Sequence, residues 1–228
     1  FRLLKSPWRA DRFRQVIQDA DGAVPQGGWP SIVFSNHDQS RHIDRYGHHG
    51  DAVRRARAAA VLLFTLRGTP FLYYGEEIGM RNGRLRYRDL RDPYTKRYWP
   101  FRTGRDPART PMQWDGSLQA GFTTGQPWLP ISGHLSSLNV ENESKDPSSL
   151  LSLYRRLIRL RKVMPTLRHG MYRPLESTDP NCLVFVRKDD SPAGAREETL
   201  IAVNFSSHRS SGSVSGMARE GTLVLSTY

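Results

Sequence analysis

Two short apolar runs each end abruptly in polar side chains, and each follows a stretch with helical spacing. The run SIVF at 31–34 passes into Asn-His-Asp, and the run PFLYY at 70–74 passes into Gly-Glu-Glu. Apolar residues recur with a helical period over 6–20 and again over 51–67. Because helices alternating with buried strands are typical of parallel β/α architecture, we predict an α/β fold for this part of the chain.

The polar residues after the first run then have a structural explanation. In α/β barrels, functional side chains lie at the carboxyl ends of the strands. We therefore expect SIVF to form barrel wall and Asn36, His37 and Asp38 to project at the barrel mouth.

The remainder of the chain divides by composition. Residues 81–144 show little periodicity and are dense in Pro, Gly, Trp and Arg, which predicts a long ordered loop. A further helix is expected from Asp146-Pro147. The runs CLVFVRK, TLIAVNFS and TLVLSTY then predict a small all-β domain. We expect residues 1–169 to form the α/β part and residues 170–228 the β domain.

Composition narrows the functional classes. The net charge is +12, but the arginines are spread over every segment and no basic run interleaved with exposed aromatic residues is evident, so no nucleic-acid partner is expected. No apolar stretch approaches the length that a bilayer crossing needs, so we expect no membrane association. Cys182 is the single cysteine, which excludes an internal disulfide and suits a cytoplasmic protein.

His37 and Asp38 could serve several chemistries. A transition-metal site lacks the usual spacing of His and Cys ligands, and a serine hydrolase triad lacks a nucleophile elbow. We therefore expect neither a metal nor a cofactor. An acidic acceptor beside a histidine donor suits hydrogen bonds to hydroxyl groups, which points to a sugar ligand.

The motif RDPARTPMQW offers two guanidinium groups, those of Arg105 and Arg109. A guanidinium fork can hold vicinal hydroxyls, or it can organise the loop by pairing with an acid such as Asp106. The residues alone leave both readings open. Glu76 and Glu77 resemble paired catalytic acids, but adjacent residues after a strand point in opposite directions, so we assign them to loop organisation.

Four segments follow one another along the chain: FSNHDQSR, GTPFLYYGEEIGM, GRDPARTPMQWDGSLQAGFTTGQPWLPI and NVENESKDPSSLLSLYRRLIRLRK. Together they resemble the α-amylase superfamily of glycoside hydrolases, and within it the α-glucosidase and oligo-1,6-glucosidase branch. The resemblance covers nearly the whole chain. It implies the last part of a (β/α)8 TIM barrel, with SIVF and PFLYY as its seventh and eighth strands, followed by a small Greek-key β-sandwich that is truncated here.

The resemblance also implies roles for individual residues. Asp38 would be the acid that stabilises the transition state, and His37 would bind the same sugar. Arg105 would hold the glucose at the non-reducing end, with Arg109 a weaker match for substrate binding. The substrate would be a small oligosaccharide such as maltose or isomaltose, cleaved with retention of configuration. Nothing here matches the nucleophilic Asp or the acid/base Glu of the family, so their strands are expected to precede Phe1.

Three functional alternatives therefore stay open. The first is a retaining α-glucosidase whose missing amino-terminal barrel strands are the main partner of this chain, so that these residues alone are inactive. The second is a transglycosylase such as a trehalose synthase or a sucrose isomerase. The third is a sugar-binding or chaperone-like homologue without the catalytic acids, against which the presence of His37 and Asp38 counts.

Overall fold

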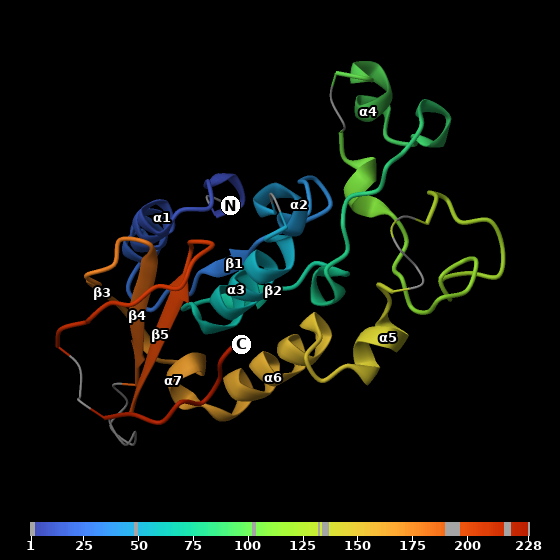
Figure 1. Cartoon of the computed structure of the whole chain (residues 1–228). Coiled ribbons are helices and arrows are strands. Elements are labelled where there is room, and N and C mark those ends of the chain that lie inside the picture. The colour runs from blue at the N-terminus through green and yellow to red at the C-terminus, as the bar shows by residue number, and fades with distance from the viewer. Residues whose placement is uncertain are drawn as a thin grey trace. The chain divides into compact units, whose positions relative to one another are not determined.

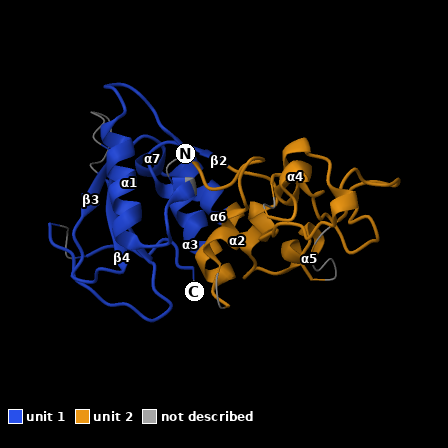
Figure 2. Ribbon diagram, turned by 90° about the horizontal axis from the view of Figure 1, so that it is seen from above, with its two compact units in different colours: residues 1–32, 57–71, 156–228 blue, residues 33–56, 72–155 orange. Residues whose placement is uncertain are grey.

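The computed structural model describes most of the chain, namely residues 3–47, 50–101, 104–131, 133, 137–189, 197–216 and 220–227. The chain divides into two compact units (Figure 2). Unit 1 comprises residues 1–32, 57–71 and 156–228, and unit 2 comprises residues 33–56 and 72–155.

Helices and strands alternate irregularly along the chain (Figure 1). The α-helices are α1 (Ala10–Gly22), α2 (His42–Tyr46), α3 (Ala52–Thr65), α4 (Pro93–Tyr98), α5 (Val140–Lys145), α6 (Leu150–Val163) and α7 (Pro165–Arg168). The 3-10 helices are η1 (Leu3–Lys5), η2 (Glu76–Ile78), η3 (Tyr87–Asp89) and η4 (Asp106–Arg109). The strands are β1 (Ser31–Val33), β2 (Thr69–Phe71), β3 (Met171–Leu175), β4 (Cys182–Lys188) and β5 (Glu198–Asn204).

In unit 1, helix α1 begins later than the sequence predicts. Ser6-Pro7 was expected to start it, but the helix begins at Ala10, and its N-cap residue makes no side-chain capping bond. The reason lies in Trp8, whose ring packs 4.5 Å from that of Phe205 and 5.3 Å from that of Phe13. This aromatic cluster anchors the segment before the helix to the core of the unit.

Unit 1 contains two small sheets. Strands β1 and β2 form one, and β3, β4 and β5 form an antiparallel sheet in sequence order (Figure 1). The described residues form no closed barrel and no second sheet facing β3–β5, so the expected barrel and Greek-key sandwich are represented only in part. The predicted strand TLVLSTY is absent over the described residues 222–227, whereas β3 was not predicted.

Strand β2 departs from the predicted burial. The run PFLYY was expected to be covered on both faces, but the strand ends at Phe71. Phe71 is 54% exposed and Leu72 is 41% exposed. In the described part of the chain these apolar side chains lack the neighbours that a central strand of a parallel sheet would have.

Two arginines of unit 1 satisfy the carboxyl end of α3. Arg161 donates to the carbonyls of Phe64, Leu66 and Gly68, and Arg187 donates to that of Thr65. The last carbonyls of a helix lack partners within the helix, and cationic donors suit them.

In unit 2, the predicted loop 81–144 contains several short helices, namely η3, α4, η4 and most of α5. Two apolar clusters order it, so its aromatic and Pro-rich composition indeed reflects an ordered segment. One cluster joins Leu85, Leu90 and Leu129, and the other is formed by Ile78, Met80, Met112 and Leu151 with Val140.

The helix expected from Asp146 begins four residues later. Asp146 Oδ1 accepts hydrogen bonds from the backbone N–H and the hydroxyl of Ser148, both at 2.7 Å. These bonds form a local turn, and α6 starts at Leu150. A short aspartate side chain can bond its own neighbouring backbone in this way and compete with helix formation.

Candidate functional site

Four side chains that the sequence analysis singled out lie together in unit 2. Asp38 Oδ1 lies 3.2 Å from Arg109 Nη2 and 3.5 Å from Arg105 Nη1. The other carboxylate oxygen of Asp38 lies 3.5 Å from His37 Nε2. The structure thus brings His37, Asp38, Arg105 and Arg109 into one polar cluster.

The backbone after β1 fixes the position of Asp38. Its N–H donates to Asn36 Oδ1 at 2.9 Å, which closes a tight turn directly after the strand. Arg109 Nε donates to the backbone carbonyl of His37 at 2.9 Å. Arg109 therefore holds both the main chain of the turn and the carboxylate that the turn presents.

Arg105 is held mainly by a different acid, Asp92. Its Nη2 lies 2.5 Å from Asp92 Oδ1 and its Nε lies 3.1 Å from Asp92 Oδ2. The side chain of Asp92 is 1% exposed, whereas that of Arg105 is 40% exposed. The pair is the two-pronged arrangement that guanidinium and carboxylate groups favour.

Asp92 and Arg105 each stabilise the charged form of the other. Hydrogen bonds from Arg105 hold the pKa of Asp92 well below its usual range, and Asp92 in turn raises the pKa of Arg105. Both groups therefore stay charged at any pH near neutrality.

Helix α4 positions Asp92. Asp92 is the N-cap residue of the helix and accepts hydrogen bonds from the N–H and the hydroxyl of Thr95, the latter at 2.8 Å. Thr95 Oγ1 also accepts the backbone N–H of Arg105 at 3.1 Å. Gly104 makes this approach possible: its φ is +61°, and a Cβ there would collide with the Thr95 side chain.

The acid that pairs with Arg105 is not the one suggested by the sequence. Asp106 was named as a possible partner, but its Oδ2 accepts the backbone N–H groups of Arg91 and Asp92 at 2.7 and 2.8 Å. Asp106 is fully buried. It therefore organises the loop through backbone contacts, and the organising ion pair is formed by Asp92.

Asp92 and Thr95 were missed, although the sequence carried a signal for them. The dipeptide Asp92-Pro93 has a capping side chain followed by proline in the first helical turn, the same pattern that was used to place a helix after Asp146. The signal identifies a helix start and says nothing about a distant arginine. The ion pair with Arg105 depends on tertiary structure.

Glu76 is buried and pairs with a histidine. Glu76 Oε1 and Ser35 Oγ both lie 3.2 Å from His42 Nδ1, and Glu76 and His42 are almost fully buried. A hydrolytic triad needs its serine and its acid on different ring nitrogens. Because both partners here meet the same nitrogen inside the core, the group is structural, in agreement with the loop-organising role predicted for Glu76.

Glu77 also faces inward. Its Oε2 atom is buried and has no hydrogen-bond partner among the described residues. Burial raises the pKa of Glu77, and the charge of Glu76 acts in the same direction, whereas backbone hydrogen bonds from Glu77 and Gly75 and the charge of Arg41 oppose it.

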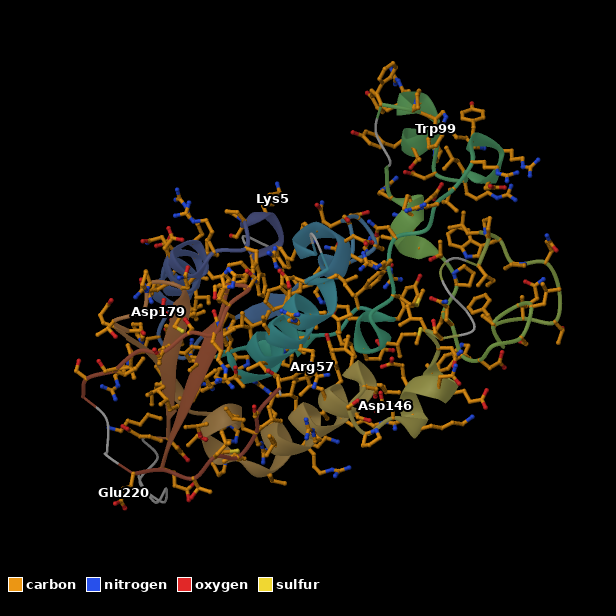
Figure 3. All side chains as sticks on the ribbon, in the orientation of Figure 1. Lys5, Arg57, Trp99, Asp146, Asp179 and Glu220 are labelled. Atoms are coloured by element: carbon orange, nitrogen blue, oxygen red, sulfur yellow. The ribbon has the colours of Figure 1, made fainter. Side chains whose placement is uncertain are left out.

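We expected no basic run interleaved with exposed aromatic residues, and this expectation is wrong for the segment 84–101. Its arginines and lysine are exposed, and exposed aromatic side chains lie between them; Figure 3 marks Trp99 after α4. The exposed aromatic residues are Tyr87, Tyr94, Tyr98, Trp99 and Phe101. A basic run interleaved with exposed aromatics does exist, so the expected absence of a nucleic-acid partner stays a prediction without that support.

No group of three or more His, Cys, Asp or Glu side chains among the described residues is placed to hold a metal ion. None of the helices that the structure describes has both the length and the hydropathy that a membrane crossing requires.

The polar cluster suits the binding of hydroxyl groups. The Asp38 carboxylate is 46% exposed, so it can accept hydrogen bonds from a ligand, while two guanidinium groups hold it in place. Retaining glycoside hydrolysis needs a nucleophile and a proton donor. Among the acids near the turn, Glu76 is committed to His42 and Asp92 to Arg105, which leaves Asp38 as the accessible carboxylate of the described cluster.

Comparison with known proteins gives consistent matches. The family model for the α-amylase catalytic domain matches residues 4–170. The oligo-1,6-glucosidase of Heyndrickxia coagulans is 36% identical over 221 residues, covering 88% of this chain and 39% of that protein. The trehalulose synthase of Pseudomonas mesoacidophila MX-45 superposes with a TM-score of 0.75 at 33% identity, over 86% of this chain and 38% of that one.

A second solved structure, described as an α-glucosyl transfer enzyme, gives a TM-score of 0.80 at 35% identity. It covers 90% of this chain and 37% of that one. The chain therefore spans about two fifths of the length of the proteins that it matches.

Proposed function

The chain belongs to the α-amylase catalytic-domain family, and on that premise we propose that it is part of a retaining α-glucosidase. In this proposal the substrate is a short oligosaccharide with a terminal α-linked glucose, such as maltose or isomaltose. Residues 1–169 contribute the last part of the (β/α)8 barrel, with β1 and β2 as its seventh and eighth strands. Residues 170–228 contribute to the β-sandwich domain.

The observation that carries the proposal is the cluster around Asp38. An exposed carboxylate lies in the turn that comes after β1, next to a histidine, and two arginines contact it from the loop 81–144. In the proposed site Asp38 accepts hydrogen bonds from hydroxyls of the reacting glucose. Such contacts accelerate the reaction only to the extent that they strengthen as the sugar ring flattens in the transition state.

The arginines take different parts in this proposal. Arg109 contacts both His37 and Asp38, whereas two of the three side-chain nitrogens of Arg105 are engaged by Asp92. The geometry favours Arg109 as the arginine that borders the sugar. Arg105 contributes chiefly through its remaining nitrogen, Nη1.

We assign the nucleophile and the acid/base residue to barrel strands outside residues 1–228. One carboxylate attacks the anomeric carbon and the other protonates the leaving oxygen. In that arrangement Asp38 is a third acid, and the cluster described above completes a site whose reacting groups come from elsewhere.

Glucosyl transfer is the second candidate activity. It is favoured by the similarity of this chain to a trehalulose synthase and to an α-glucosyl transfer enzyme. Hydrolysis and transfer share the covalent glucosyl intermediate and differ in whether water or a sugar hydroxyl attacks it. The product spectrum distinguishes the two.

A chimaera tests the proposal. Residues 1–228 replace the matched part of the oligo-1,6-glucosidase of Heyndrickxia coagulans, which supplies the remaining barrel. We expect the chimaera to release glucose from isomaltose or maltose, and product analysis separates hydrolysis from transfer.

Two further proteins complete the experiment. The Asp38→Asn chimaera should be inactive, and an Asp89→Asn chimaera serves as a matched control that removes a carboxylate from the loop. A chimaera that is folded by circular dichroism and monodisperse, yet inactive on all α-glucosides, would contradict the proposed function and favour a non-catalytic homologue.

A further inference from the structure

We propose that Asp92 is a positioning residue that keeps Arg105 from occupying the carboxylate of Asp38. The inference rests on the proposed function, because it concerns the availability of Asp38 to a sugar. It adds a residue that the sequence analysis did not identify.

The two acids compete for one guanidinium group. Asp92 takes Nε at 3.1 Å and Nη2 at 2.5 Å, while Asp38 receives only Nη1 at 3.5 Å, the outer limit of a hydrogen bond. Arg105 is therefore bound at two points by Asp92 and at one weak point by Asp38. The contact that would otherwise satisfy Asp38 is directed away from it.

Burial decides this competition. The Asp92 side chain is 1% exposed and that of Asp38 is 46% exposed. A buried carboxylate without a cation is costly, whereas an exposed one is stabilised by water. The arginine consequently gains more free energy at Asp92, where its removal would leave a charge inside the protein.

Asp92 is itself held rigidly, which makes the arrangement a fixed one. Thr95 donates its hydroxyl hydrogen to Asp92 Oδ2 at 2.8 Å, and the same hydroxyl oxygen accepts the backbone N–H of Arg105 at 3.1 Å. Both ends of the Arg105 residue are thus tied to the start of α4. The side chain cannot turn toward Asp38 while this contact set is intact.

Removal of the Asp92 charge should therefore close the site. In Asp92→Asn the guanidinium loses its ionic partner, and Asp38 is the nearest remaining carboxylate that already touches it. A two-pronged pair between Arg105 and Asp38 would occupy the oxygens that the sugar hydroxyls need. If Asp92 contributed to stability alone, its replacement would leave the Asp38 carboxylate accessible.

Four versions of the chimaera test this: the wild type, Asp92→Asn, Arg105→Gln and the double variant. Isomaltose affinity is measured by calorimetry, and the contact between Arg105 and Asp38 is read from crystal structures of the sugar-free proteins. We expect Asp92→Asn to weaken binding about tenfold, the size of one charge-assisted hydrogen bond. The double variant should bind better than Asp92→Asn alone, because it lacks the competing arginine.

The structural readout is independent of sugar binding. In Asp92→Asn the guanidinium of Arg105 should form a two-pronged contact with Asp38 that the wild type lacks. Asp89→Asn, which removes a carboxylate three residues away, should leave both measurements as in the wild type. A double variant that binds no better than Asp92→Asn, or an Arg105 side chain that does not approach Asp38 in Asp92→Asn, would overturn the proposal.

Failure of the proposed function has a different signature. If the wild-type chimaera does not bind isomaltose while Arg105 moves onto Asp38 in Asp92→Asn, Asp92 positions Arg105 and the ligand assignment is wrong. If binding is normal and unaffected by Asp92→Asn, the ligand assignment stands and the positioning role is wrong.

Discussion

Arg109 bonds to the turn around Asp38 in two ways: Nη2 lies 3.2 Å from the Asp38 carboxylate and Nε lies 2.9 Å from the carbonyl of the preceding residue. One side chain from η4 thereby fixes the main chain after β1 and the acid that it presents. The arrangement ties the long loop 81–144 to the strand end, and it gives the loop a defined role in the candidate site.

Replacement of Asp38 is the most direct test of its role. Asp38→Asn keeps the shape of the side chain and removes the charge. In the chimaera we expect kcat to fall at least about a hundredfold and KM to rise by no more than about tenfold, because the contact that is lost also binds the substrate but is strongest in the transition state. Steady-state kinetics on maltose and isomaltose measure this, and near-normal kcat would remove Asp38 from the catalytic set.

The two arginines should respond differently to lysine. Arg109→Lys loses the fork that joins carboxylate and carbonyl, so kcat/KM should fall by roughly tenfold or more. Arg105→Lys should affect thermal stability more than kcat/KM, because its main partner is buried Asp92. Kinetics and melting curves of both variants provide the comparison, and equal effects on both quantities would argue for a shared structural role.

Gly104 should be intolerant of any side chain. Gly104→Ala places a Cβ against the Thr95 side chain at a φ of +61°, which L-residues rarely adopt. We expect α4 to shift and the hydrogen bonds between Thr95, Asp92 and Arg105 to weaken, with loss of about 1–3 kcal/mol of stability. Urea unfolding measures the loss.

Gly125 offers a control for this change. It lies in the same loop, and the atom nearest to a Cβ placed there is the Thr123 hydroxyl oxygen, at 3.9 Å. Gly125→Ala should leave the unfolding midpoint almost unchanged. If both alanine variants behave alike, the close approach of Gly104 to Thr95 does not constrain the loop.

The stability of the protein should depend on pH through the protonation of Glu77. Burial raises its pKa in the folded protein above the ordinary value of 4.5. The folded state then binds the proton more tightly than the unfolded state, so the charged form destabilises the protein as pH rises through and above this range. Glu77→Gln should raise the melting temperature at neutral pH, and the advantage should disappear at pH 4 and below.

Exposed Glu141, which pairs with Lys145, provides the control for that prediction. Glu141→Gln should show no gain at neutral pH. Thermal melts between pH 4 and pH 8 follow both variants. A Glu77→Gln variant that is less stable than wild type at pH 8 would mean that the carboxylate has a partner that compensates its burial.

Parts of the fold could be read from the sequence because they are local. The run CLVFVRK coincides with β4, and the helical period over 6–20 overlaps most of α1. Strand β3 was missed because Arg173 and Pro174 interrupt its apolar character. Proline is tolerated there because β3 is an edge strand of its sheet, a fact that only the topology supplies.

In the candidate site, too, the local features could be predicted and the tertiary contacts could not. The turn that presents His37 and Asp38 could be predicted, since it follows a short apolar run. The partner of Arg105 could not, because Asp106 is its neighbour in sequence while Asp92 precedes it by 13 residues, and only the fold shows that the more distant carboxylate faces the guanidinium. Exposure of Phe71 was likewise not predictable, because burial of a strand depends on its neighbours in space.

Arg187 is the residue of unit 1 whose removal should cost most stability. It is fully buried on β4, and donates to the Gly170 carbonyl from Nε and Nη2 at 3.0 and 2.7 Å and to the Thr65 carbonyl from Nη1 at 2.6 Å. Burial, with Arg161 nearby, lowers the pKa of Arg187, so the buried charge itself costs free energy that these hydrogen bonds offset.

Arg187→Met removes the charge and keeps an apolar stem of similar length. It also leaves the two carbonyls without their donor, which outweighs the relief of the buried charge because charge-assisted bonds are the stronger kind. We expect the free energy of unfolding to fall by about 2–4 kcal/mol, measured by urea denaturation. Half-exposed Arg173 on β3 gives the control, and its methionine variant should change stability by less than about 0.5 kcal/mol. An Arg187→Met protein as stable as wild type would show that an apolar side chain serves equally well at this position.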